Sequence, residues 1–84
     1  LWRDFIHDFN LIKGRLDITP AHIYLVLKLA ADKDGVSRYI MTKELDIGEA
    51  TARTLQNKLK ELDILKPIRS GHILTNKGTK IYNY

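Results

Sequence analysis

One segment, from Arg38 to Asn57, constrains the fold of this 84-residue chain more than any other. Its sequence is RYIMTKELDIGEATARTLQN, and its apolar residues predict two short amphipathic helices joined by a tight turn. The side chains expected in a shared core are Met41, Leu45, Ile47, Ala52 and Leu55. The second helix then exposes small, polar and cationic side chains on its far side, namely Ala50, Arg53, Thr54 and Asn57.

Two further helices are predicted before this segment. Residues 1–14 form an amphipathic helix that ends at Gly14. Its apolar side is made by Trp2, Phe5, Ile6, Phe9 and Ile12. Thr19 and Pro20 supply an N-cap and a first helical residue for a second helix, which runs to about Lys33 and ends at Asp34-Gly35. That helix is apolar on most of its surface, so it is expected at the centre of the core.

A helical pair, a hairpin and a last helix are predicted after Gly35. Ser37 can cap a helix over residues 38–45, and a helix over residues 49–62 follows the turn. Residues 64–68 and 72–74 are β-like and are separated by the turn residues Ser70-Gly71, while Pro67 suits an edge strand. Thr75 then caps a helix that extends to Tyr84. The expected fold is therefore mainly α with a small β-hairpin.

Composition and charge narrow the class of protein. With 44% apolar and 29% charged residues, the chain has the composition of one globular domain. It has no cysteine, which excludes disulfides and thiolate metal sites and is compatible with the cytoplasm. No apolar stretch is long enough to span a bilayer, so no membrane partner is expected. Because the chain begins with Leu1 and not Met, we expect it to be part of a longer protein.

The positive charge is concentrated in one part of the chain. Residues 1–34 hold five basic and five acidic side chains, whereas residues 35–84 hold nine basic and five acidic ones, which accounts for the net charge of +4 (9 − 5). A basic region beside a neutral body favours a surface that faces a polyanion. A solvated basic surface without a partner would have the same composition.

Two local patterns support a resemblance to a known family. LDIGEATAR, from Leu45 to Arg53, resembles the turn and recognition helix of helix-turn-helix regulators, and ILTNKG, from Ile73 to Gly78, resembles a wing strand that runs into the next helix. In this order the elements resemble the winged helix-turn-helix domains of MarR-like prokaryotic and archaeal transcription regulators. The resemblance implies a winged helix-turn-helix domain over residues 19–84, with the helix of residues 1–14 added to it. Asp46 and Asp63 stand where that family usually has glycine, at positions that need a left-handed or turn conformation.

The resemblance implies sequence-specific binding of double-stranded DNA by a cytoplasmic transcription regulator. Helix 49–62 would enter the major groove, where Arg53 can read guanine, Asn57 can read adenine, and Ala50 and Thr54 can touch a thymine methyl. Phosphate contacts would come from the backbone amides that follow Gly48 and from Arg38, Lys43, Lys58, Arg69, Lys77 and Lys80. The wing, residues 65–75, would place its tip in the minor groove with Arg69, Ser70, Gly71 and His72.

Several alternatives stay open. Arg53 could pair with Glu49 four residues earlier, and His72 could be a partly buried strand residue. The domain could instead dock other proteins, or bind RNA through the same basic surface. The helix with Trp2, Phe5, Ile6 and Phe9 could pack inside the chain or form a homodimer, and a further domain or ligand could lie outside this chain. No motif for a nucleophile, a metal or a phosphate loop is present, so we expect no cofactor and no enzymatic activity.

Overall fold

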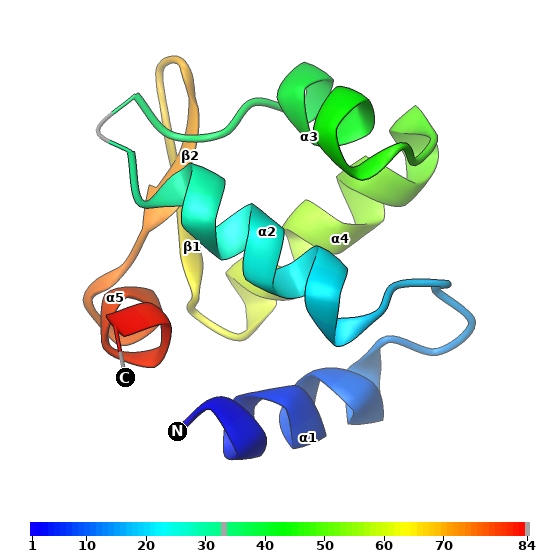
Figure 1. Cartoon of the computed structure of the whole chain (residues 1–84), viewed down its shortest axis with the longest axis vertical. Helices are drawn as coiled ribbons and strands as arrows, with labels where there is room; N and C mark the ends of the chain where they lie inside the picture. The colour runs from blue at the N-terminus through cyan, green and yellow to red at the C-terminus, as the bar shows by residue number, and fades with distance from the viewer. Residues whose placement is uncertain (33, 84) are drawn as a thin grey trace.

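A computed structural model describes residues 1–32 and 34–83, which form helices around one core and a single hairpin (Figure 1). The helices in this described part are α1 (Trp2–Ile12), α2 (Pro20–Ala30), α3 (Arg38–Leu45), α4 (Glu49–Glu61) and α5 (Asn76–Asn83). The hairpin is made by β1 (Leu65–Ile68) and β2 (Gly71–Leu74). This mainly helical, winged-helix-like architecture confirms the fold class expected from the sequence.

The helix starts follow the capping residues of the sequence. The Thr19 hydroxyl accepts a hydrogen bond from the His22 amide at 3.3 Å, and the His22 ring accepts one from the Thr19 amide at 3.1 Å. The Ser37 hydroxyl accepts a hydrogen bond from the Ile40 amide at 3.2 Å. These contacts satisfy amides that no helical carbonyl can reach, so the predicted N-caps at Thr19 and Ser37 are confirmed.

The second helix ends earlier than the sequence predicts. It ends at Ala30, and the predicted end at Lys33 lies outside the described residues. The Asp32 carboxylate accepts a hydrogen bond from the Asp34 amide at 3.2 Å, and the Asp32 carbonyl accepts one from Gly35 at 2.9 Å. This local turn competes with the helix for the same backbone groups, which explains the early end. At the end of the chain, the prediction that the last helix reaches Tyr84 also falls outside the described part.

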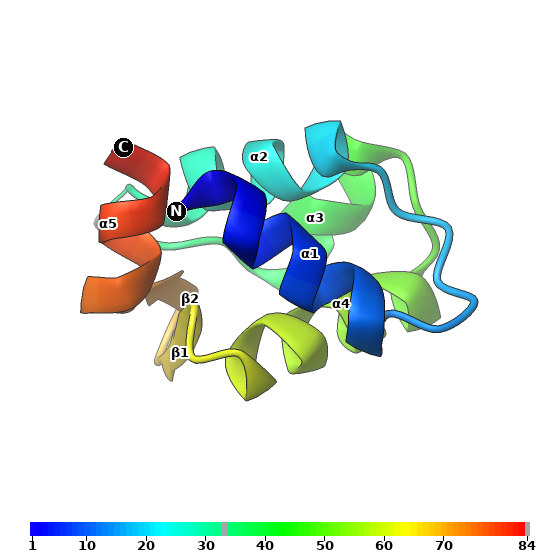
Figure 2. The ribbon, with the colours of Figure 1, turned by 90° about the horizontal axis from the view of Figure 1, so that it is seen from below.

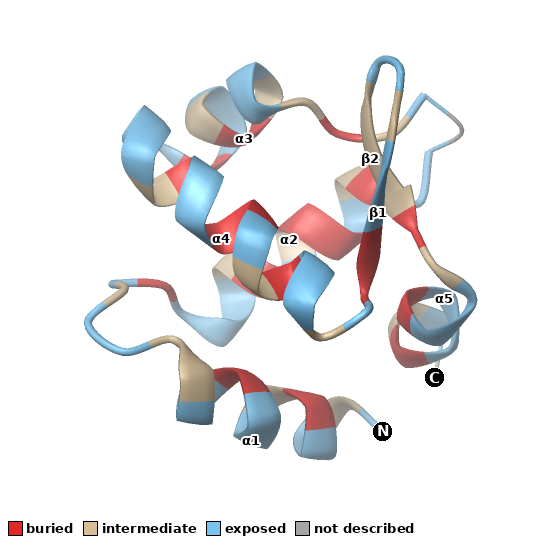
Figure 3. Ribbon diagram, turned by 180° about the vertical axis from the view of Figure 1, so that it is seen from behind, coloured by how far each residue is buried: buried red, intermediate tan, exposed pale blue. Residues whose placement is uncertain are grey.

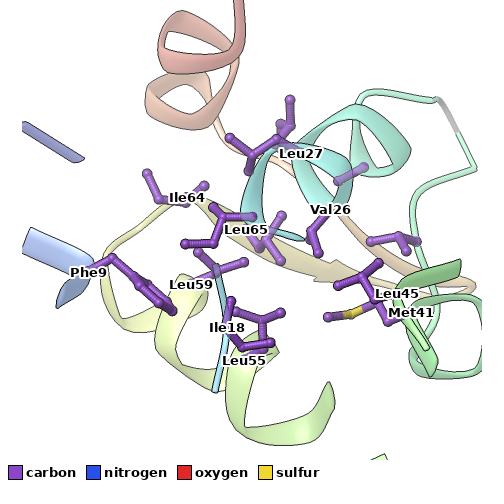
Figure 4. Packing of buried hydrophobic residues seen from close by; sticks show 14 of the residues in the cluster. Phe9, Ile18, Val26, Leu27, Met41, Leu45, Leu55, Leu59, Ile64 and Leu65 are labelled. Carbon is purple, nitrogen blue, oxygen red and sulfur yellow. The ribbon is translucent and has the colours of Figure 1, made fainter. Parts of the chain in front are cut away.

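The core joins all the helices, including the first. Its largest fully buried side chains lie on α1, α2, α3 and α4 and just after α4 (Figure 4). They include Phe9, Ile23, Leu27, Met41, Leu55, Leu59 and Ile64. Phe5 and Phe9 of α1 are buried within the chain, while Trp2 and Ile6 are half-buried. Figure 2 shows α1 nearest the viewer, with its first turn beside α5. The aromatic side of this helix therefore packs inside the chain.

The hairpin is attached to the body by a third backbone segment. β1 and β2 are antiparallel and pair from Leu65 with Leu74 to Ile68 with Gly71. On the other side of β2, Val36 pairs with His72 through two backbone hydrogen bonds of 2.8 and 2.9 Å. The predicted hairpin is thus confirmed, with one residue of difference at the start of each strand. Throughout the residues described, no helix is long and apolar enough to cross a membrane.

Candidate nucleic-acid interface

The fourth helix turns one side to the core and the other to the solvent. Ala52, Leu55, Gln56 and Leu59 are buried. On the opposite side are the four side chains expected to be exposed there, Ala50, Arg53, Thr54 and Asn57, and all four are exposed. Seen from behind, this exposed side of α4 is turned toward the viewer, with α3 on one flank and the hairpin on the other (Figure 3). The expected division of α4 into a core side and an outward side is confirmed.

The start of this helix has free backbone groups. Gly48 is the N-cap of α4, and no side chain supplies a capping hydrogen bond there. A Cβ atom built on Gly48 would have no other atom within 4 Å, so the surroundings are open. The first amides of a helix are unpaired donors at the positive end of its dipole, and open access lets an anion approach them.

Glu49 pairs with both arginines of this region. Its carboxylate lies 3.6 Å from the Arg38 guanidinium, across the turn between the two helices, and 3.7 Å from the Arg53 guanidinium. The alternative in which Arg53 pairs with Glu49 is therefore observed, and Arg38 joins the same carboxylate. All three side chains are exposed, so water and salt weaken both ion pairs.

The tip of the wing is basic and held in place. Arg69 and Ser70 form the turn of the hairpin and are exposed. The Ser70 hydroxyl donates a hydrogen bond to the Asp34 carbonyl at 3.0 Å, which ties the tip to the loop before α3. The Arg69 side chain is consequently presented from an anchored turn.

His72 does not lie at the tip, contrary to the expected minor-groove contact. It pairs with Pro67 and Val36 inside the three-segment sheet. Both ring nitrogens are buried and have no hydrogen-bond partner among the described residues. Burial lowers the pKa of His72 below its ordinary value of 6.5, and the positive charges of Lys60 and Arg38 lower it further. The ring is therefore a neutral group between the wing and the body, as the strand alternative had it.

Lys77 and Lys80 lie apart from the surface made by α4 and the wing. Lys77 is in the first turn of α5, and its ammonium donates a hydrogen bond of 3.1 Å to the Leu62 carbonyl, just after α4. It satisfies a carbonyl at the negative end of that helix. Lys77 and Lys80 line a groove shared with α1. The structure thus places these two lysines, both predicted to contact phosphate, at a groove beside α1.

The two other lysines predicted to contact phosphate lie on α3 and α4. Lys43 is exposed in the last turn of α3, and Lys58 is half-buried in the last turn of α4. Two further residues were not among the predicted contacts. Lys60 is exposed on α4 and is close enough to His72 to lower its pKa, and Tyr39 is 69% exposed beside Arg38. Lys60 could not be assigned to the wing side of α4 from the sequence, because that assignment depends on where the hairpin packs, and the local pattern does not encode it.

Metal ligands do not gather anywhere in residues 1–32 and 34–83. No group of three or more histidine, aspartate or glutamate side chains there could hold a metal ion. The exposed cations, amides and hydroxyl groups of α3, α4 and the wing can donate hydrogen bonds to an anion.

Comparison with known proteins gives one family. Residues 22–80, more than half of the chain, match the family model described as PH0730-like, N-terminal domain. No curated protein and no solved structure matches the chain significantly. The matched range begins in α2 and extends through the helical pair and the hairpin into α5. On the strength of this match, the chain belongs to the family of PH0730-like N-terminal domains.

Proposed function

We propose that this domain binds double-stranded DNA sequence-specifically, as the DNA-binding part of a cytoplasmic transcription regulator. In this proposal α4 enters the major groove and the wing lies beside it. One observation carries the proposal: small, polar and cationic side chains occupy the exposed side of a helix that follows a short bracing helix and precedes a hairpin. The same order of elements supports the resemblance to MarR-like winged helices.

Cations on both flanks of α4 support this orientation. Arg38 lies at the start of α3 and Arg69 at the wing tip. Lys60 and Arg38 both lower the pKa of His72, so their positive charges act on the buried ring of the wing from α4 and from α3. Such a surface attracts a polyanion and supplies phosphate contacts that orient a helix over base edges.

The exposed residues of α4 divide into two roles in this proposal. Arg53 and Asn57 read guanine and adenine through pairs of hydrogen bonds in the major groove. The Thr54 hydroxyl already donates to the Ala50 carbonyl at 3.0 Å, so its methyl group and that of Ala50 are suited to apolar contact with thymine. The open amides after Gly48 add a phosphate contact.

Glu49 would have to release its arginines on binding. Each of its ion pairs is exposed, and such pairs are worth roughly 0–1 kcal/mol in water. Replacing these weak ion pairs by contacts with phosphate or guanine therefore costs little free energy. The Glu49 carboxylate itself repels phosphate, so it weakens the contact that the amides after Gly48 make with a phosphate group.

The proposal is tested by fluorescence anisotropy with duplex DNA of random sequence at several salt concentrations. We expect binding that weakens with a log–log slope of roughly −3 to −6, because several phosphates are neutralised. After site selection from a random library, Arg53→Ala should cost roughly 1–3 kcal/mol and relax the preference at one base pair. Lys28→Ala, on an exposed part of α2, is the matched control and should leave binding to the selected site nearly unchanged.

A protein-docking module is the second candidate, and two observations favour it. Glu49 places a negative charge on the first turn of α4, and Tyr39 exposes a large aromatic ring beside it. Exposed aromatic residues are enriched in protein interfaces. No DNA binding at low salt would reject the DNA proposal for this domain and leave docking, and equal affinity for RNA of mixed sequence would favour the RNA alternative.

A further inference from the structure

A groove lies between the first and last helices, α1 and α5, whose ribbons lie next to each other in Figure 2. Its volume is about 430 Å³, which is within the range of small-molecule sites, roughly 300–1,000 Å³. Phe5, Leu62 and Ile81 supply its apolar surface, and Phe5 and Ile81 are buried. Small-molecule sites in proteins are usually lined by apolar side chains with a few charged or polar groups among them.

The charges around this floor are separated by sign. Asp4 and Asp8 stand four residues apart on α1, whereas Lys77 and Lys80 stand three residues apart on α5. A third carboxylate, Asp63, belongs to the loop after α4. Within the described residues, no aspartate of the groove lies within ion-pair distance of either lysine. The opposite charges therefore face the same cavity without neutralising each other.

Each helix carries an unfavourable pair of like charges at this groove. Side chains three or four residues apart on a helix are neighbours, so Asp4 with Asp8, and Lys77 with Lys80, repel each other. Lys77 uses one ammonium hydrogen on the Leu62 carbonyl, and an ammonium group has two more. A ligand with a positive group near α1 and a negative group near α5 would relieve both repulsions at once.

We propose that this groove binds a small zwitterionic molecule with an apolar body, such as a free apolar amino acid. Its amine contacts the carboxylates of Asp4 and Asp8, its carboxylate contacts the ammonium groups of Lys80 and Lys77, and its apolar part covers Phe5 and Ile81. The groove is separate from the exposed side of α4, so this inference does not depend on DNA binding.

The test uses three probes with the same side chain and different end groups: L-phenylalanine has both charges, N-acetyl-L-phenylalanine lacks the positive one, and L-phenylalaninamide lacks the negative one. Binding is followed by ¹H–¹⁵N chemical shifts of the whole ¹⁵N-labelled chain and by the fluorescence of Trp2, whose ring is 5.7 Å from that of Phe5. We expect saturable shifts at Phe5, Leu62 and Ile81 with L-phenylalanine. Loss of either charge should weaken affinity about twofold to fivefold, as expected for one partly exposed charge contact.

Two variants assign each charge to its wall. Asp8→Asn should reduce the preference for L-phenylalanine over the N-acetyl compound, since Asp4 remains, and keep the full preference over the amide. Lys80→Gln should do the reverse. Asp17→Asn and Lys28→Gln are exposed and outside the groove lining, so they should bind all three probes as the unaltered chain does.

Three results would overturn the inference. The first is the absence of saturable shifts, and the second is equal affinity for the three probes, which would mean apolar contact alone. The third is a set of shifts confined to residues outside the groove. Each of these results leaves the DNA proposal untouched, because the anisotropy experiment reads a different surface.

Discussion

Two aspartates adopt the left-handed backbone conformation that favours glycine. Asp46 has φ of 54° at the end of α3, and Asp63 has φ of 60° after α4. The conformation lets the chain reverse at the end of a helix, and aspartate tolerates it better than most residues do. The turn conformation expected at both positions is confirmed, so these residues carry strain that glycine would not.

Asp46→Gly should therefore stabilise the fold by about 0.5–1 kcal/mol, because glycine adopts this conformation without a steric penalty. Urea denaturation followed by circular dichroism measures the change. Asp17→Gly is the control, since Asp17 is exposed and is not among the residues with positive φ. That change should instead lose about 0.4–1 kcal/mol through the greater freedom of the unfolded chain. Equal effects at the two positions would argue against strain at Asp46.

His72 makes stability depend on pH. Its pKa is lowered in the fold by burial and by Lys60 and Arg38, so the unfolded chain takes up a proton more readily. Above about pH 6.5 the His72 ring is neutral in both the folded and the unfolded chain. As the pH falls from 6.5 toward the lower pKa of the folded state, the unfolded chain is protonated first, so the free energy of unfolding decreases. Urea midpoints at pH 7.5 and 5.5 should differ less for His72→Leu than for the unaltered chain. His7→Gln, on an exposed part of α1, should keep the full difference.

Local patterns predict which side chains face outward, but not what those side chains meet. The helical period of α4 was enough to expose Arg53 and Asn57. For His72 the sequence offered both a groove contact and a partly buried strand residue, and which of them holds depends on the approach of Val36, distant in sequence. The same is true of Lys77, whose partner is the carbonyl of Leu62. Contacts of this kind arise only when separate elements pack together.

At the level of elements, the wing depends on two close backbone approaches. Gly35 has φ of 71°, and a Cβ there would collide with the His72 carbonyl. On the other side, a Cβ on Gly71 would lie 2.6 Å from the Val36 carbonyl. Both contacts flank the paired residues Val36 and His72. A side chain at either glycine would push the hairpin away from the loop before α3.

Gly35→Ala should destabilise the domain by more than the roughly 1–2 kcal/mol that a left-handed alanine costs, because the clash adds to the backbone strain. Gly14→Ala is a matched control, since Gly14 has φ of 61° with no other atom within 4 Å of a Cβ. It should show the backbone cost alone. Hydrogen exchange at the Val36 and His72 amides should accelerate only in the Gly35 variant, and equal acceleration in both would contradict the role of the contact.

Most helices and strands could be predicted from the residues at which they start and end, and the exceptions have local causes. Thr19, Ser37 and Thr75 mark helix starts, because their hydroxyl groups accept hydrogen bonds from backbone amides within the first turn. The early end of α2 depends on the carboxylate of Asp32, which captures the Asp34 amide. Apolar periodicity does not register such competition, because it reports side-chain burial and not backbone hydrogen bonding.

At the scale of the molecule, α1 belongs to the same core as the family domain. The family match begins at residue 22, yet Phe9 is fully buried against the rest of the chain. The aromatic rings of α1 also reach the other helices, since Trp2 lies 6.0 Å from Tyr24, whose ring lies 5.7 Å from that of Tyr82. A homodimer through this helix stays a prediction; of the four residues expected to form it, Phe5 and Phe9 are buried within the chain, and Trp2 and Ile6 are half-buried.

Phe9→Ala should cost about 3–5 kcal/mol of unfolding free energy, because it leaves a cavity in a shared core. Leu11→Ala on the same helix should change stability by no more than about 0.5 kcal/mol, since Leu11 is 71% exposed. Both are measured by urea denaturation. A small effect of Phe9→Ala would mean that α1 is an appendage and that the core closes without it.

The pairing of Val36 with His72 has a consequence for recognition. It fastens the hairpin to the loop that leads into α3, and the Ser70 hydroxyl fastens the tip to the same loop. The distance between Arg69 and the exposed side of α4 is then set when the chain folds, not when it meets a partner. Under the proposed DNA binding, this fixed distance would select a target by the spacing between its grooves as well as by its bases.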